Sequence, residues 1–129
     1  MKEMQRYISQ LNEAQQAPVL QKDGPMIVIA GAGSGKTRVL TVRIANLMSQ
    51  GVDAFNILAL TFTNKAAREM KKRIADIVGN NEAKNLWMGT FHSVFAKILR
   101  IEAEKLGYPS NFTIYDTQDS VRLIGAIIK

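Results

Sequence analysis

The chain has no cysteine, three prolines and a single histidine among its 129 residues. Without cysteine it can form neither a disulfide nor a thiolate metal site, and one histidine with scattered carboxylates gives no metal-binding cluster. No uninterrupted apolar run approaches the ~18–20 residues that a membrane span needs. The first residues, Met1 to Arg6, precede no apolar core of the kind that a signal peptide has. We therefore expect a cytoplasmic protein.

What is present is ordinary for one globular domain. Hydrophobic residues make up 47% of the chain, and the length is sufficient for a core. Seventeen basic and eleven acidic residues give a formal net charge of +6, which is a weak indication of a polyanionic partner. Residues 61–75 contain five of the bases and one acid, Glu69. A solvated helix face is the ordinary explanation for such a run.

Four apolar segments typical of strands each precede an amphipathic helical segment. The expected strands are residues 26–30, 57–62, 86–91 and 112–115, and the expected helices are residues 35–50, residues 65–78, a third ending at Gly107 and a fourth from Thr117. Residues 5–20 predict one or two helices interrupted by Pro18. This alternation predicts an α/β fold with a parallel sheet sandwiched by helices, and ligands then bind at the carboxyl ends of the strands.

Residues 30–37 carry the most specific pattern. They read Ala-Gly-Ala-Gly-Ser-Gly-Lys-Thr directly after the first expected strand, which is typical of the phosphate-binding loop of nucleoside triphosphatases, with alanine in place of its leading glycine. Glycines let backbone N–H groups point at phosphates. Lys36 is predicted to reach the β- and γ-phosphates, and the Thr37 hydroxyl to ligate Mg²⁺. The other interpretation is a glycine-rich turn without a ligand.

Asp116 is the one candidate for the acidic residue that holds Mg²⁺ in such enzymes. It follows the apolar segment 112–115, as that role requires. The alternative is a helix N-cap, with Asp119 in the first helical turn. The pattern favours the N-cap, and we expect the catalytic carboxylate to lie outside this chain.

Two motifs around the loop resemble the UvrD/Rep/PcrA family of superfamily 1 DNA helicases. Leu11-Asn12-Glu13-Ala14-Gln15 is similar to the family's Q motif, whose glutamine reads adenine; the spacing selects Gln15 although Gln16 is adjacent. The leading Ala30 and the arginine after the loop, Arg38, also match the family. The resemblance therefore implies an ATP site formed by Gln15, Ala30, Gly31, Ala32, Gly33, Ser34, Gly35, Lys36, Thr37 and Arg38, with Lys36 and Thr37 as its catalytic residues.

Two further segments resemble DNA-binding motifs of the same family. Residues 60–67, Leu-Thr-Phe-Thr-Asn-Lys-Ala-Ala, are similar to motif Ia, and residues 89–93, Gly-Thr-Phe-His-Ser, to motif Ib. A phenylalanine can stack on a base, and hydroxyl, amide and imidazole groups can bind sugar or phosphate. The alternatives are that Thr63 or Asn64 is a plain N-cap and that His92 is a surface residue. The implied DNA-binding residues are Thr61, Phe62, Thr63, Asn64, Thr90, His92 and Ser93.

The resemblance covers residues 11–119 and implies an ATP- and Mg²⁺-dependent motor that translocates on single-stranded DNA, usually 3′ to 5′, and opens duplexes. The final segment, residues 120–129, is still strongly apolar and has no helix breaker. We therefore expect residues 1–129 to be the N-terminal part of a RecA-like P-loop ATPase domain, truncated near the first helical insertion. Two alternative functions are a P-loop phosphotransferase and a nucleotide-sensing module that binds single-stranded DNA without hydrolysis.

Overall fold

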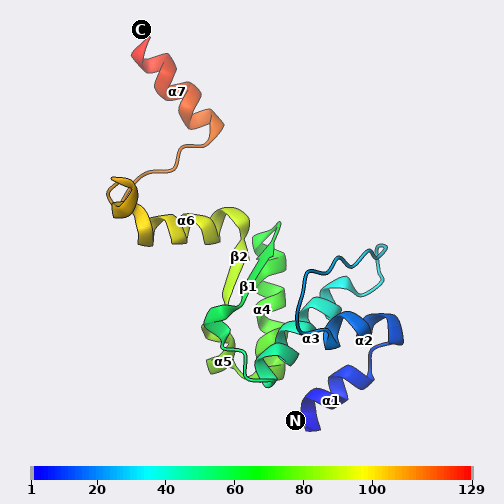
Figure 1. Cartoon of the computed structure of the whole chain (residues 1–129). Helices are drawn as coiled ribbons and strands as arrows, with labels where there is room; N and C mark the ends of the chain where they lie inside the picture. Colours follow the sequence, from blue (N-terminus) through cyan, green and yellow to red (C-terminus); the bar gives the residue numbers. More distant parts are fainter. Residues whose placement is uncertain (1, 129) are drawn as a thin grey trace. The chain divides into compact units, whose positions relative to one another are not determined.

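A computed structural model describes residues 2–128 of the chain, and its contacts divide them into two compact units. The N-terminal unit extends to Val94, and the C-terminal unit begins at Phe95, inside helix α6. In chain order the elements are α1 (Lys2–Ser9), α2 (Glu13–Leu20), α3 (Lys36–Ser49), the 3-10 helix η1 (Ala54–Asn56), β1 (Leu58–Thr61), α4 (Asn64–Val78), α5 (Asn80–Lys84), β2 (Trp87–Thr90), α6 (Phe91–Glu102), the 3-10 helix η2 (Ala103–Leu106) and α7 (Thr117–Ile127) (Figure 1).

The sheet of the N-terminal unit consists of β1 and β2, which are parallel. The register pairs Leu58 with Trp87 at one end and Thr61 with Thr90 at the other. Helices α4 and α5 form the connection between the strands, so both strands end at the same edge. The prediction of parallel strands at 57–62 and 86–91 is confirmed.

Two apolar clusters hold the N-terminal unit together, and α3 contributes to both. The first surrounds the sheet and comprises Ile44, Ala54, Ile57, Ala59, Met70, Ile74, Ala83 and Leu86. The second joins α3 to the N-terminal helices and comprises Met4, Ile8, Leu11, Val19, Val39, Val42 and Ala45. Buried apolar residues therefore fall on several faces of α3. The two clusters hold α3, the helix that follows the phosphate-loop sequence, against both the sheet and the N-terminal helices.

The first expected strand is absent. Residues 26–30 have no regular structure, and Ile27 and Ile29 are 88% and 95% exposed. The prediction of a strand at 26–30 is therefore wrong for this structure. An apolar run becomes a strand only where a neighbour pairs with it and covers it, and the sheet of the described residues consists of β1 and β2 alone. The expected strand at 112–115 is absent for the same reason.

The helices also depart from expectation in two places. The sheet is not sandwiched, because Ala59 and Thr61 are buried whereas Leu58 is 51% exposed, and α4 is the helix that contacts both strands. Pro18 does not interrupt a helix. It lies in the last turn of α2, and its carbonyl accepts a hydrogen bond from Arg43. The break falls earlier, at residues 10–12, because Asn12 caps α2.

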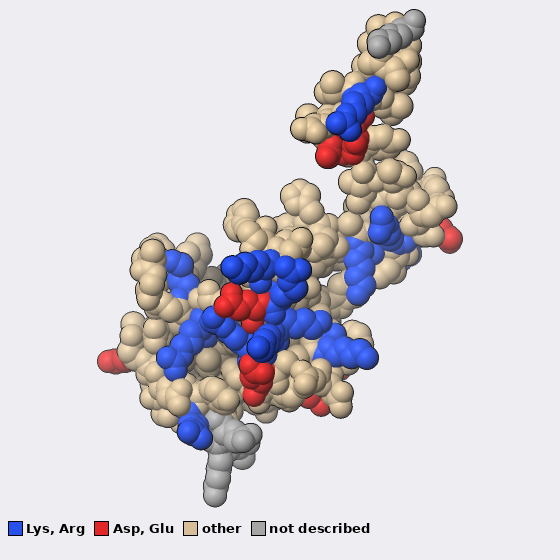
Figure 2. Space-filling view, turned by 180° about the vertical axis from the view of Figure 1, so that it is seen from behind, with Lys and Arg blue, Asp and Glu red and all other residues tan. Residues whose placement is uncertain are grey.

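Helix α4 has an apolar face and a basic one. Ala67, Met70 and Ile74 are buried against the first cluster, whereas the lysines and arginines of the helix face solvent on the other side. The view from behind shows Lys and Arg side chains gathered on this unit, with a few carboxylates among them (Figure 2). Thus the predicted amphipathic helix is confirmed within one residue at its start, and it ends at Val78, directly before Gly79.

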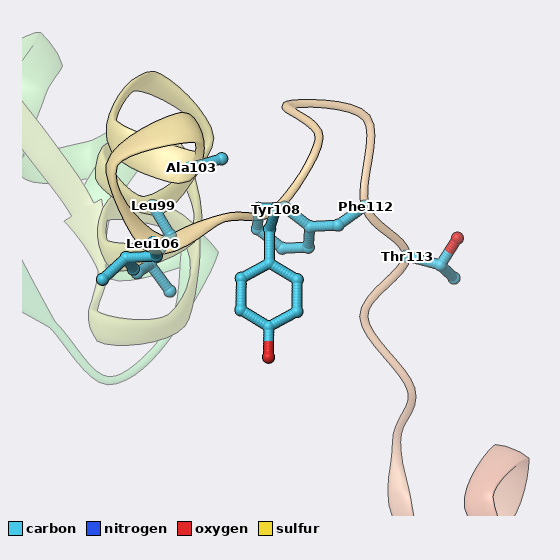
Figure 3. A pocket seen from close by; sticks show the side chains of 6 residues that line it. All are labelled: Leu99, Ala103, Leu106, Tyr108, Phe112 and Thr113. Atoms are coloured by element: carbon cyan, nitrogen blue, oxygen red, sulfur yellow. The ribbon is translucent and has the colours of Figure 1, made fainter.

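The C-terminal unit contains most of α6, η2 and α7. Gly107 ends η2 with a φ of 75°, as its place after the third expected helix predicts. The Arg100 guanidinium lies 5.7 Å from the centre of the Phe112 ring. An apolar pocket of about 260 Å³ is lined by Leu99, Ala103, Leu106, Tyr108, Phe112 and Thr113 (Figure 3). No helix among residues 2–128 is long and apolar enough to cross a membrane.

Candidate nucleotide and nucleic-acid sites

The glycine-rich loop, residues 30–37, forms a turn that leads directly into α3. Gly33 and Gly35 have φ angles of 76° and 83°, a region that residues with a Cβ rarely enter. Gly35 is also the N-cap of α3, and it has no side chain with which to cap the helix. The first N–H groups of α3 therefore lack a side-chain cap, and together with the helix dipole they favour an anion at this end.

Lys36 is bound to its own loop. Its Nζ donates hydrogen bonds to the carbonyls of Ala30, at 2.8 Å, and Gly31, at 2.9 Å. The Ser34 hydroxyl donates to the same Gly31 carbonyl at 2.6 Å. The ammonium group is thus held over the loop, while Thr37, the next residue, is exposed in the first turn of α3.

Gln15 connects α2 to the glycine-rich loop. Its Oε1 accepts from the backbone N–H of Asn12 at 3.2 Å and completes a capping box, because the Asn12 side chain accepts from the Gln15 N–H. Its Nε2 donates to the Ser34 carbonyl at 2.9 Å. Gln15, the residue predicted to read adenine, is therefore bonded to the predicted phosphate loop at Ser34, which lies 19 residues later in the sequence. By contrast, Gln16 binds the Leu11 carbonyl within the helical region.

Arg38 lies one residue beyond Thr37 and is exposed. Its Nη2 donates to Gln10 Oε1 at 3.0 Å, which ties the first turn of α3 to the segment between α1 and α2. A groove beside it is lined in part by Tyr7, Gln10, Arg38 and Thr41. The residues predicted for the nucleotide site, from Gln15 to Arg38, are thus brought together in one part of the N-terminal unit.

The two segments predicted to bind DNA meet at the carboxyl edge of the sheet. The register pairs Thr61 with Thr90, so the residues that follow, Phe62 and Phe91, leave the strands side by side. Their ring centroids are 6.0 Å apart and the ring planes are inclined by 53°. Phe62 is 94% exposed and Phe91 is 46% exposed. Two accessible aromatic rings therefore stand at one edge.

All four hydroxyls predicted to contact DNA form hydrogen bonds within the fold. Thr61 is buried, and its Oγ1 lies 3.0 Å from the Thr63 carbonyl. Thr63 is the N-cap of α4, with its Oγ1 accepting from the Ala66 N–H at 3.1 Å. Thr90 Oγ1 accepts from the Ser93 N–H at 3.2 Å at the start of α6. The N-cap interpretation of Thr63 is confirmed, and N-capping leaves the threonine exposed to a ligand.

Gly89 is required by the same turn. A Cβ built on Gly89 would lie 2.6 Å from Ser93 Oγ and 2.9 Å from Val94 Cγ2. Ser93 Oγ in turn donates to the Thr90 carbonyl at 3.0 Å. The Ser93 and Val94 side chains approach Gly89 so closely that they would have to shift to admit a Cβ. Phe91 and the exposed His92 lie in the same first turn of α6.

Phe91 is a candidate that the sequence reasoning missed, because the residue was assigned to the end of a strand. The available signal was the repeated Thr-Phe pair, Thr61-Phe62 and Thr90-Phe91, at the ends of two strands expected to be parallel.

For Asp116, the sequence had favoured a helix N-cap over a Mg²⁺ ligand. Asp116 is the N-cap of α7 and forms a capping box with Asp119, at 2.8 Å from the Asp119 N–H, which confirms the N-cap interpretation.

Comparison with known proteins adds an independent finding. The family model described as the UvrD/REP helicase N-terminal domain matches residues 11–129. The ATP-dependent DNA helicase PcrA of Bacillus subtilis (strain 168) is 52% identical over 123 residues, which are 95% of this chain and 16% of that protein. The proteins of the same name from Staphylococcus aureus (strain Mu50) and Staphylococcus epidermidis (strain RP62A) are 47% and 48% identical over 127 residues, 98% of this chain and 17% of theirs.

The chain thus spans about a sixth of the length of the curated relatives that it matches. The match begins at Leu11, the first residue of the segment similar to the Q motif, and includes both the glycine-rich loop and the paired Thr-Phe edge. By this match to the model of the family's N-terminal domain, the chain belongs to the UvrD/REP helicase family.

Proposed function

We propose that the full-length protein is an ATP-dependent DNA helicase that moves along single-stranded DNA. In this proposal the chain is the first part of a RecA-like ATPase domain. The observation that carries it is the presence, in one unit, of a phosphate-loop sequence opening α3 and a paired aromatic edge at the strand ends. The names of the relatives, ATP-dependent DNA helicases, agree with both sites.

The loop residues fit a nucleoside triphosphate. A Cβ on Gly31 or Gly33 would contact nothing within 4 Å, so the space in front of the backbone is open. Lys36 has an exposed ammonium that neutral loop carbonyls hold, and phosphates are a stronger partner for it than carbonyls. Lys36 would bind the β- and γ-phosphates, and the Thr37 hydroxyl would ligate Mg²⁺. When bound, ATP with Mg²⁺ supplies the phosphoanhydride bond whose hydrolysis drives movement.

Gln15 is suited to orient the adenine. A glutamine amide offers two N–H donors and two acceptor lone pairs. One of each is used within the chain, toward Ser34 and Asn12. One donor and one acceptor therefore remain for the adenine edge, and the bond to Ser34 keeps the base-reading amide in register with the loop that would hold the phosphates.

The aromatic edge is suited to single-stranded DNA. Phe62 is almost fully exposed, and an exposed ring at the edge of a sheet can stack on a base of any sequence. Phe91, inclined to it at 6.0 Å, limits the space available to that base. Asn64 and His92, exposed next to the two rings, would bind the sugar-phosphate backbone.

The experiment that tests the proposal is the ATPase rate of the full-length protein with and without single-stranded DNA. We expect strong stimulation by an oligonucleotide and, from the family resemblance, unwinding of duplexes that carry a 3′ single-stranded tail in preference to a 5′ tail. An ATP turnover that single-stranded DNA leaves unchanged, but that a small-molecule phosphate acceptor raises, would instead establish a phosphotransferase.

A further inference from the structure

A groove of about 440 Å³ lies along α4 and α5, outside both sites described above. The side chains that line it include four cations and two amides: Arg68, Lys71, Lys72, Lys84, Asn80 and Asn81. The remaining lining residues are two alanines of the same helices. Every polar side chain that lines the groove therefore donates hydrogen bonds, either as a cation or as a neutral amide.

Within residues 2–128, no carboxylate lines this groove, although acids occur on both helices. Glu69 on α4 is engaged elsewhere, in an ion pair with Arg73 at 2.9 Å. Glu82 on α5 is exposed and is not a lining residue. Uncompensated like charges repel, and four of them at one site leave a strong positive potential that an anionic partner would neutralise.

The walls of the groove are fixed relative to each other. Lys71 Nζ lies 3.5 Å from the Lys84 carbonyl, a contact that bridges α4 and α5. Ala83, on the wall that α5 provides, is buried in the cluster beneath the sheet. Arg68 and Lys72 are four residues apart and so lie on the same face of α4, one turn from each other. Both side chains are exposed.

The lining chemistry selects the phosphodiester backbone of duplex DNA. Sites for single-stranded nucleic acid combine cations with aromatic side chains on which bases stack, and this groove has no aromatic lining residue. Cations and amides alone contact phosphates without reading bases, which is how proteins are positioned on a duplex. A duplex also has about twice the axial charge density of one strand, since both strands contribute.

The position of the groove agrees with a duplex next to the single-strand site. Helix α4 begins two residues after Phe62, and a 15-residue helix is about 22 Å long. Lys65 lies in its first turn, Arg68 in the second and Lys72 in the third, so basic residues lead from the aromatic edge toward the groove. A DNA junction could place its unpaired strand on the rings and its paired part along α4.

From this arrangement we infer that the α4–α5 groove is a second, sequence-independent DNA site that binds the phosphate backbone of the duplex ahead of the single-stranded region. The inference rests on the proposed function, since it assumes a DNA-processing protein. Arg68 and Lys72 on α4 are the principal contacts. Lys71, also on α4, and Lys84 on α5 bridge the two helices and add two more cations. Asn80 and Asn81 add uncharged donors.

The test compares two pairs of neutral substitutions in the full-length protein. Arg68→Gln with Lys72→Gln removes two of the three α4 cations, and Lys71→Gln with Lys84→Gln removes the pair that bridges α4 and α5. A matched control, Arg6→Gln with Lys22→Gln, lowers the net charge equally at exposed positions of the same unit. Affinities are measured for a blunt hairpin duplex and for an oligothymidine over a range of salt concentrations, with circular dichroism to verify folding.

We expect each groove variant to lose about tenfold or more in hairpin affinity, with the slope of log K against log salt reduced by about 2 units. Oligothymidine affinity and the control variant should change less than twofold. An equal loss for both DNAs would make the groove part of the single-strand site and overturn the inference. Unchanged hairpin binding by both groove variants would also overturn it. Failure of the proposed function would give a different result: oligothymidine would not stimulate the ATPase activity of the wild-type protein.

Discussion

Phe62 and Phe91, 29 residues apart in the sequence, stand with their ring centroids 6.0 Å apart because the strands before them are parallel and in register. Each ring follows a threonine that ends its strand. Phe62 begins the connection to α4, and Phe91 is the first residue of α6. The pair is thus a product of topology. One residue of slippage between the strands would move one ring to the other face of the sheet.

The first prediction concerns Phe62. A buried phenylalanine loses about 3–5 kcal/mol of unfolding free energy when truncated to alanine. Because Phe62 is 94% exposed, we expect Phe62→Ala to change the unfolding free energy by less than about 1 kcal/mol. Its affinity for single-stranded DNA should fall by about 1–3 kcal/mol, the contribution of one stacked base. Denaturant midpoint and DNA affinity are measured on the same full-length variant.

Phe55 provides the matched control for this experiment. It is 61% exposed, but it lies in η1, before β1, and so at the opposite end of the strand. Phe55→Ala should leave DNA affinity unchanged, whereas Phe91→Ala should reduce it in the same way as Phe62→Ala. If Phe62→Ala destabilises the protein strongly and leaves DNA affinity intact, the ring has a packing role and the proposed stacking is wrong.

The second prediction concerns Lys36. We expect Lys36→Ala in the full-length protein to abolish ATP turnover and unwinding while leaving nucleotide-free DNA binding within about twofold of wild type. The reason is that the Lys36 ammonium is bonded to the carbonyls of Ala30 and Gly31 in the glycine-rich loop, a different segment from the two Thr-Phe turns. ATPase and DNA-binding assays on one preparation test it. An equal loss of DNA binding without ATP would contradict the assignment.

Local signals in the sequence predicted the helices well because they act within a few residues. Gly79 after α4 and the capping pair Asp116 and Asp119 fix boundaries without help from distant residues. The turn at the glycine-rich loop was predictable for the same reason, since its glycines act on their own backbone. The expected strand at 26–30 failed because a strand is defined by its neighbour, and in the described residues nothing pairs with it.

At the candidate DNA edge, too, local features were predictable from the sequence and features that depend on distant residues were not. The sequence indicated Phe62 and both turns, because each motif is contiguous. It did not identify Phe91, since the importance of that ring comes from the pairing of Thr61 with Thr90 across two strands. Nor did it predict that Thr61 would be buried and bonded to the Thr63 carbonyl, which depends on the packing of the strand end.

The third prediction concerns Gly89. Its missing Cβ would lie 2.6 Å from Ser93 Oγ and 2.9 Å from Val94 Cγ2, so Gly89→Ala requires these two side chains at the start of α6 to shift. We expect a destabilisation of about 1–3 kcal/mol, the usual effect of overpacking, together with weaker single-stranded DNA binding because Phe91 shifts. Denaturant unfolding and DNA affinity test both effects.

Gly125 is the control for Gly89. It lies inside α7, and a Cβ there would contact nothing within 4 Å. Gly125→Ala should therefore stabilise the helix by up to about 1 kcal/mol, because alanine has the higher helix propensity. If Gly89→Ala is as well tolerated as Gly125→Ala, the close approach of strand and helix does not constrain the edge.

The last prediction concerns the 129-residue chain on its own. Asp116 is engaged as the N-cap of α7, and no group of three or more His, Asp or Glu side chains among the described residues could hold a metal ion. In the proposed function Thr37 would supply one Mg²⁺ ligand, which by itself does not make a site. We expect the chain to bind ATP through Lys36 and the loop but to turn it over far below ~1 s⁻¹, the low end of ordinary enzymes. A steady-state assay with Mg²⁺ and single-stranded DNA tests this, with the Lys36→Ala chain as the background. Turnover at or above that rate, abolished by Asp116→Asn, would give Asp116 a catalytic role and make the chain a complete ATPase.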